Sequence, residues 1–290
     1  MTTTDGNRIA KVMASRGLCS RREAERWIEA GRVSVDGTVL TSPALTVTDK
    51  NIVLVDGKPL PAAEPPKLWR YHKPRGLVTT HSDPEGRDTV FAKIAQSHPH
   101  LPRLISVGRL DLNSEGLLLL TNSGELSRAL ESPKNAWVRR YRARVNGRVD
   151  EKKLEALKDG VTISGIRYGP IEAKLESQKG ANAWLDVALT EGKNREVRNI
   201  MEHLGLPVSR LLRISYGPLH LGKLERGDVR AVAAGTLLDH VGALVPDLDL
   251  PGAQSRRENP NRKGWAKAKA KPKAKAKHKK HTPRISKTKK

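Results

Sequence analysis

The chain has 290 residues, of which 37% are hydrophobic, and a formal net charge of +23. Its single cysteine, Cys19, excludes an internal disulfide and a zinc site built from several cysteines. No signal peptide or stretch long enough to span a bilayer is evident, so we expect a cytoplasmic protein that does not enter membranes. The excess of positive charge indicates a polyanionic partner, with nucleic acid favoured over an anionic membrane surface.

Residues 6–61 are predicted to form one small α+β domain. The segment "RIAKVMASRG" has helical apolar spacing, and "SRREAERWIEAGR" begins with Ser20 and Glu23, which are spaced as a capping box. "VSVDGTVL" and "IVLVDGKPL" each alternate like strands around an Asp-Gly turn, at 36–37 and 56–57. This order predicts two helices followed by hairpins.

Basic side chains gather on the outward face of the second predicted helix and at the start of the hairpin. They can contact phosphates of a structured RNA without reading its sequence. A solvated helix face would show the same pattern, so both interpretations stay open. The candidate RNA-binding residues here are Arg21, Arg22, Arg26 and Arg32.

A proline-rich linker at 61–67 leads into a second predicted domain, residues 66–250. Segments typical of strands are "LWRYHKPRGLVTT", "RLISVGRLD", "GLLLLTN", "RRYRARVNG", "AWLDVALTEG" and "LLRISYGPL". Segments typical of helices are "SGELSRALES", "DEKKLEALKDG" and "NREVRNIMEHLG". Because strands and helices do not alternate strictly, we predict an α+β fold with a largely antiparallel, mixed sheet.

The segment "GRLDLNSEGLLLLTN", residues 108–122, places Asp111 between Arg109 and a run of four leucines. Such a run predicts a buried element, beside which an unpaired carboxylate is costly. Asp111 is therefore either a catalytic group or the residue of a turn that caps a helix.

The last segment, residues 253–290, is rich in lysine and arginine and has little apolar content. Residues 256–290 carry a net charge of +15, which leaves +8 on the rest of the chain. Repulsion between like charges predicts that this tail is disordered when free and that it binds RNA non-specifically.

Residues 6–60 resemble the small RNA-binding domain of the S-four type, mainly through "SRREAERWIEAGRVSVDG". Residues 108–122 resemble the catalytic motif of the RsuA/RluB-type RNA pseudouridine synthases. Other pieces of that family follow in order: "KPRG", "DPEGRDTVF", "RRYRARVNG" and "EGKNREVRNIMEHLGLPVSRLLRISYGPL". Together they cover most of residues 69–221, and the resemblance is greatest to synthases of large-subunit ribosomal RNA.

The resemblance implies a chemistry for three residues. Asp111 is the catalytic carboxylate, Tyr141 holds the detached uracil ring, and Arg198 forms an ion pair with Asp111. The reaction breaks a glycosidic bond, so a carboxylate is needed where positive charge develops on the ribose. The detached base needs a dry pocket, and we expect the leucine run to supply one wall.

The resemblance also implies contacts with RNA outside the reacting base. Arg109 fills the space that a flipped uridine leaves in its stem. Lys193, Asn194 and Arg195 contact the RNA, although Lys193 stands where arginine is often found.

We therefore expect a pseudouridine synthase that acts on one uridine of 23S ribosomal RNA or of a pre-50S particle, as a monomer. The reaction changes no oxidation state, so neither a cofactor nor a metal is implied. Two alternatives remain: the same chemistry on 16S ribosomal RNA, and a non-catalytic factor that binds ribosomal RNA during ribosome assembly.

Overall fold

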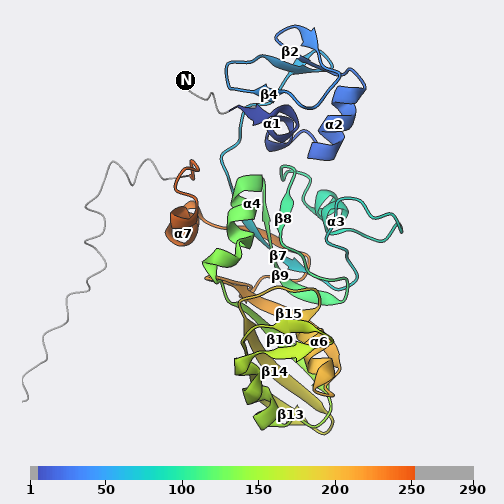
Figure 1. Ribbon diagram of the computed structural model, residues 1–290, viewed down its shortest axis with the longest axis vertical. Helices are drawn as coiled ribbons and strands as arrows, with labels where there is room; N and C mark the ends of the chain where they lie inside the picture. Colours follow the sequence, from blue (N-terminus) through green and yellow to red (C-terminus); the bar gives the residue numbers. More distant parts are fainter. Residues whose placement is uncertain (1–5, 252–290) are drawn as a thin grey trace, which may run out of the picture. The chain divides into compact units, whose positions relative to one another are not determined.

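The computed structural model describes residues 6–251 (Figure 1). The predicted disordered tail at 253–290 lies outside these residues. Within the described part, no helix has the length and apolar character required to cross a membrane. The predicted domain limits, 6–61 and 66–250, remain predictions.

The N-terminal part folds as the predicted small α+β unit, with two short helices and two small sheets. One sheet pairs β1 with β4, and the other has the order β3-β2-β5-β6. The elements are β1 (Asn7–Arg8), α1 (Ile9–Ser15), α2 (Arg21–Glu29), β2 (Val33–Val35), β3 (Thr38–Val39), β4 (Thr46–Val47), β5 (Val53–Val55) and β6 (Lys58–Pro59).

Local sequence explains why this unit forms. The backbone N–H of Glu23 donates to the Ser20 side chain, and the Ser20 N–H donates to the Glu23 carboxylate, so the predicted capping box is confirmed. Asp36 and Asp56 both have positive φ, as each of the two predicted Asp-Gly turns requires. Apolar side chains of both helices and of the strands then share one small core.

The second part is built on one large sheet with strand order β13-β14-β10-β15-β9-β7-β17. All neighbours along it are antiparallel except β15 and β9, which confirms the largely antiparallel, mixed sheet. Its strands are β7 (Leu68–Lys73), β9 (Ser114–Thr121), β10 (Arg139–Asn146), β13 (Ile171–Lys179), β14 (Asn182–Leu189), β15 (Val208–Tyr216) and β17 (Val229–Ala231), with β8 (Ile105–Val107) and β16 (Leu219–His220) attached beside β9 and β15.

Helices and short strands complete this part of the chain. They are α3 (Val90–Ser97), α4 (Gly124–Glu131), α5 (Glu151–Glu155), β11 (Val161–Ile163), β12 (Ile166–Tyr168), α6 (Glu196–His203) and α7 (Ala234–Val241). The segments predicted as helices correspond to α4, α5 and α6. The sequence patterns did not reveal α3, α7 or the strands between 161 and 179. One predicted strand, residues 68–80, ends at Lys73, because Pro74 has no backbone N–H to continue the ladder.

The leucine run lies in β9, in which every residue is buried. Leu118 and Leu120 pack into the core that includes Tyr141, whereas Leu117 and Leu119 pack into a second core on the opposite face. A strand that is buried on both faces needs apolar side chains at every position, which explains the four consecutive leucines in the sequence. β9 therefore separates the two cores of the domain.

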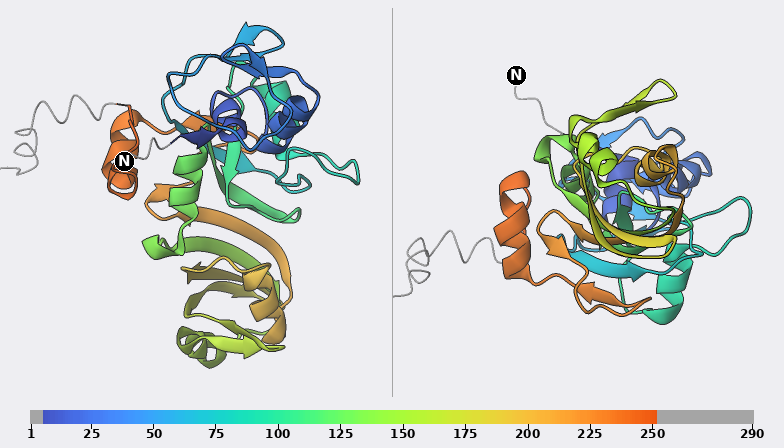
Figure 2. Two further views of the ribbon diagram at one scale, coloured as in Figure 1. Left: turned by 45° about the horizontal axis from the view of Figure 1, so that its top comes forward. Right: turned by 90° about the horizontal axis from the view of Figure 1, so that it is seen from below.

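The long strands β10 and β15 are visibly curved (Figure 2). Their pairing is interrupted between Arg140 and Tyr141 and again between Arg144 and Val145. Such irregularities bend a strand and change the direction of its side chains. The first one lies directly at Tyr141, the residue that was predicted to hold the uracil ring.

Gly116 of β9 lies against the backbone of Arg213 on the parallel neighbour β15. Its φ is +104°, and a Cβ there would overlap the Arg213 carbonyl oxygen. We predict that Gly116→Ala lowers the free energy of unfolding by about 3 kcal/mol or more, because strain and a backbone clash add together. Urea denaturation measures this change.

Gly222 provides the matched control, since its φ is +60° but no atom would meet a Cβ within 4 Å. Gly222→Ala should cost only about 1 kcal/mol. Equal losses of unfolding free energy for the two variants would show that the close approach of β9 to β15 is not the reason for glycine at position 116.

Candidate active site

A cavity of about 860 Å³ opens on one face of the large sheet. Its walls come from six segments that are distant in sequence: the β7–α3 loop, the β8–β9 loop, the end of α4, β10, the β14–α6 loop and β15. Asp111, Tyr141 and Arg109 all line it. The structure therefore brings the predicted carboxylate and the predicted aromatic residue together in one site.

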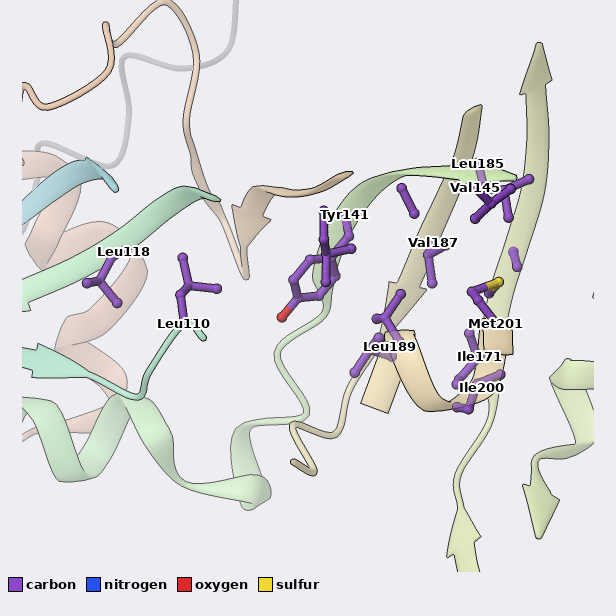
Figure 3. Close-up of a cluster of buried hydrophobic side chains, with 14 of the residues drawn as sticks. Leu110, Leu118, Tyr141, Val145, Ile171, Leu185, Val187, Leu189, Ile200 and Met201 are labelled. Atoms are coloured by element: carbon purple, nitrogen blue, oxygen red, sulfur yellow. The ribbon is translucent and has the colours of Figure 1, made fainter. Parts of the chain in front are cut away.

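Tyr141 lies at the end of the larger core that borders the cavity. Figure 3 shows its ring between Leu110 and Leu118 on one side and Leu189 on the other. The residue is 9% exposed, so most of the ring is fixed by packing while one part reaches the cavity. An aromatic face held in this way can stack on a nucleobase.

The Asp111 loop is held by a buried ammonium group at the end of β7. Lys73, with 0% exposure, donates from Nζ to the carbonyl oxygens of Pro74 (3.1 Å), Asp111 (3.1 Å) and Ser114 (2.9 Å). Burial lowers the pKa of Lys73 to about 8, although the negative charges of Asp111 and Glu115 oppose this shift. Lys73 thus fixes the backbone on both sides of the loop.

Three further hydrogen bonds fix the same loop. The Thr79 hydroxyl donates to the Leu110 carbonyl at 2.7 Å, and the Gly76 N–H donates to the Leu112 carbonyl at 2.9 Å. Arg198 donates from Nη2 to the Asn113 carbonyl, also at 2.9 Å. Lys73 donates to the carbonyls of residues 111 and 114. Each carbonyl from residue 110 to residue 114 therefore accepts a hydrogen bond.

The contacts of Arg198 differ from the ion pair with Asp111 that the family resemblance implied. Its two terminal nitrogens donate to the carbonyls of Val208 and Asn113, and no salt bridge between Arg198 and Asp111 is found within residues 6–251. Burial and the charge of Arg195 lower the pKa of Arg198, whereas the negative charge of Asp111 raises it. The predicted pair is thus an electrostatic interaction here, and the buried Nε has no hydrogen-bond partner.

A buried carboxylate on the opposite side of β9 is paired with arginines. Glu115 accepts a hydrogen bond from Arg210 Nη2 at 3.2 Å, and Arg226 Nη2 lies 3.5 Å from the same carboxylate. Burial alone would raise the pKa of Glu115, but the hydrogen bond from Arg210 and the nearby positive charges lower it. These arginines supply the partners that a buried carboxylate requires at the beginning of β9, directly after the Asp111 loop.

The leucine run does not form a wall of the cavity, which corrects our expectation. Because β9 is covered on both faces, its leucines pack into the cores behind the site. The apolar part of the lining comes instead from Val78, Leu110, Leu112, Leu189, Val197 and Leu211.

The predicted RNA-binding segment 193–195 borders the same cavity. Lys193 is held by the Arg167 carbonyl at 2.6 Å and the Glu191 carboxylate at 2.7 Å, whereas Arg195 is exposed. Next to them, Glu196 is 4% exposed, and its burial raises the pKa of its carboxyl group. The segment is therefore a fixed rim that presents Arg195 to solvent.

The arginines predicted to bind RNA in the N-terminal unit fall into two groups. Arg21, Arg22 and Arg26 are exposed on α2. Arg32 forms an ion pair with Asp56 in which Nε and Oδ1 are 2.9 Å apart, and its guanidinium lies 4.7 Å from the Trp27 ring centroid. Arg32 thus also supports the hairpin.

Comparison with known proteins agrees with this geometry. The family model for RNA pseudouridylate synthase matches residues 67–203, and the S4 domain model matches residues 7–53. A solved structure described as pseudouridylate synthase superimposes with a TM-score of 0.56 at 26% identity and covers 81% of this chain and 99% of that chain. The fold is thus that of a pseudouridine synthase that carries an S4 domain.

Proteins of similar sequence are also pseudouridine synthases. An uncharacterized RNA pseudouridine synthase of Rickettsia typhi is 45% identical over 226 residues, which cover 78% of this chain and 91% of the relative. The ribosomal large subunit pseudouridine synthase B of Salmonella typhi is 43% identical over 226 residues, covering 76% and 77%. The chain belongs to the RNA pseudouridylate synthase family, whose members are isomerases.

Sequence reasoning missed several residues that build the site. Lys73 was seen only as part of "KPRG", and its burial could have been suspected from a lysine that continues an apolar strand. Thr79, Arg139 and Arg213 also line the cavity, but an isolated threonine or arginine in a strand carries no signal of its own.

Lys73→Met tests how the Asp111 loop is positioned. Removing the ammonium leaves three carbonyls without this donor, at a cost of about 1–3 kcal/mol for an unsatisfied group. We predict that the rate of pseudouridine formation falls about tenfold to a hundredfold, because the carboxylate is no longer fixed, while RNA affinity changes less than about twofold. Single-turnover kinetics and filter binding separate these effects.

Lys93→Met, an exposed lysine on α3, is the matched control and should leave both quantities unchanged. An equal loss of RNA affinity in Lys73→Met would instead assign Lys73 to RNA binding.

Proposed function

We propose that this protein converts one uridine of large-subunit ribosomal RNA to pseudouridine, with Asp111 as the catalytic carboxylate. The observation that carries the proposal is the shared cavity in which Asp111 and Tyr141 lie beside the rim of Arg109 and Arg195. A carboxylate, an aromatic ring and flanking cations are the groups needed to cleave, hold and reattach a uracil base.

In the proposed reaction, the bond between ribose C1′ and uracil N1 breaks, and the base rotates within the cavity. A new bond then forms between C1′ and uracil C5, the C5 proton leaves, and N1 gains a proton. Positive charge at C1′ is stabilised by Asp111, either as nucleophile or as electrostatic partner. No electron acceptor or phosphate donor takes part, so atoms and charge balance within the nucleotide.

The neighbouring side chains divide the remaining tasks. Tyr141 stacks on the free base, and its phenol takes part in the proton transfer by which C5 loses a proton and N1 gains one. Arg198 interacts electrostatically with Asp111 and holds the loop through its hydrogen bond to the Asn113 carbonyl. Arg109, which is exposed at the cavity mouth, enters the stem from which the uridine has been flipped.

The substrate assignment is supported by the relatives and by charge. The Salmonella typhi relative is named for the large ribosomal subunit, and the S4-type domain of this chain exposes Arg21, Arg22 and Arg26. Phosphate contacts of this kind position a structured RNA. We place the protein in the cytoplasm, as a monomer acting on 23S ribosomal RNA or a pre-50S particle.

Asp111→Asn should abolish isomerisation, because the amide carries no negative charge with which to stabilise the developing cation, while RNA affinity stays nearly unchanged. Carbodiimide-based mapping of ribosomal RNA from a strain that expresses only the variant measures the modification. An active Asp111→Asn variant would end the catalytic assignment.

Glu131→Gln is the matched control, because this carboxylate lines the same cavity and its amide can still accept from Ser127. It should retain activity. The same mapping, applied to a deletion strain, also identifies the substrate: a pseudouridine lost from 16S ribosomal RNA, or none lost at all, would favour the two alternative functions.

Removal of residues 253–290 should weaken RNA binding and flatten its salt dependence, because about fifteen positive charges are lost. Filter binding over a series of potassium chloride concentrations measures the slope, and thermal denaturation checks that the remaining chain is folded. Unchanged affinity at low salt would refute a role for the tail in binding RNA.

A further inference from the structure

Arg213, an arginine of β15 to which the sequence analysis assigned no role, faces the cavity. Arg213 is directly opposite Tyr141 in the register of β15 and β10, so the two side chains share one face of the sheet. The residue is 3% exposed and lines the cavity. It therefore lies beside the proposed position of the uracil base.

Only some of the hydrogen-bond donors of the Arg213 guanidinium have a partner. Nε donates to the Leu117 carbonyl at 2.7 Å, and the guanidinium carbon lies 5.3 Å from the centroid of the Tyr216 ring. Nη2 is buried and has no hydrogen-bond partner. A buried cation without a carboxylate is costly, and within the described part of the chain Arg213 forms no salt bridge.

A second arginine reaches the same aromatic ring. The Arg139 guanidinium lies 4.7 Å from the Tyr216 centroid and donates to the Tyr216 hydroxyl at 3.0 Å and to the carbonyls of Trp137 and Thr190. All these acceptors are neutral, and Arg139 likewise forms no salt bridge among residues 6–251. Two positive charges thus border one part of the cavity without compensation.

Four carboxylates line the cavity, and none forms a salt bridge with Arg139 or Arg213: Asp83, which pairs with Arg87, Asp111, Glu131 and Glu196. Glu131 accepts a hydrogen bond from Ser127 at 2.7 Å and is not paired with either arginine. The negative partner that these two guanidinium groups lack must therefore come from a ligand. A phosphate fits best, because it offers charged acceptor oxygens, whereas a uracil carbonyl is neutral.

We propose that Arg213, assisted by Arg139, forms a phosphate subsite for the backbone of the flipped nucleotide. The subsite holds a phosphate adjoining the uridine whose base stacks on Tyr141, so it positions the ribose against Asp111. This inference rests on the proposed function for the identity of the nucleotide, but the phosphate preference can be measured without turnover.

The test compares uridine, uridine 3′-monophosphate and uridine 5′-monophosphate as ligands of the full-length protein, by ligand-observed NMR titration. The wild type should bind one monophosphate about tenfold or more tightly than uridine, as expected for a charge-assisted contact. Arg213→Gln should lose this preference, and Arg213→Lys should retain part of it because the charge remains.

Arg144→Gln is the matched control. Arg144 is exposed on β10, does not line the cavity, and forms no ion pair among residues 6–251, so its replacement should leave the preference intact. Arg139→Gln provides a second, less buried variant, which should reduce the preference even if Arg213→Gln folds poorly in thermal denaturation.

RNA binding gives an independent measurement. The slope of log affinity against log salt should become shallower by about 0.7–0.9 in Arg213→Gln, as for one lost phosphate contact. Equal binding of uridine and both monophosphates by the wild type, or an unchanged preference in both Arg213→Gln and Arg139→Gln, overturns the subsite. A wild type that shows the preference but makes no pseudouridine would retain the subsite and reject the proposed function.

Discussion

One buried ammonium group connects the parts of this site. Lys73 ends β7, donates to the carbonyl of Pro74, and donates across to the carbonyls of Asp111 and Ser114. The Asp111 loop has no regular secondary structure, so its position depends on these hydrogen bonds. The three acceptors are neutral, and the negative charges of Asp111 and Glu115 offset part of the desolvation of Lys73. The carboxylate and the lysine that holds its loop therefore stabilise each other electrostatically.

The loop also depends on the strand that follows it. β9 is buried on both faces, and Gly116 allows β15 to approach it closely enough for parallel pairing. This pairing brings Arg213 next to the cavity and, through β10, places Tyr141 opposite it. A bulge beside Tyr141 then sets the direction of its ring. The most buried element of the domain thus positions the groups of a site that it lines only through Ser114, its first residue.

Local signals in the sequence were sufficient for much of this structure. The capping box at Ser20, the two Asp-Gly turns and the leucine strand each follow from a few neighbouring residues, and the structure contains them all. The contacts of Lys73 and Arg198 could not be predicted, because their acceptors are backbone carbonyls up to 85 residues away that have no signature in sequence. The leucine run was expected in the cavity wall for the same reason: composition shows that it is buried, but not which core it faces.

The free site is larger and more polar than the chemistry requires. Charged residues such as Arg109, Arg195 and Glu196 line the cavity together with leucines and valines, and the volume of about 860 Å³ is open to solvent at its mouth. Under the proposed function, the dry environment that protects a detached base must be completed by the RNA itself. Binding energy from phosphates far from the reacting bond, at α2 and at the cavity rim, then serves to seat the nucleotide and exclude water. This explains why the catalytic cavity is combined with so much positive charge elsewhere on the chain.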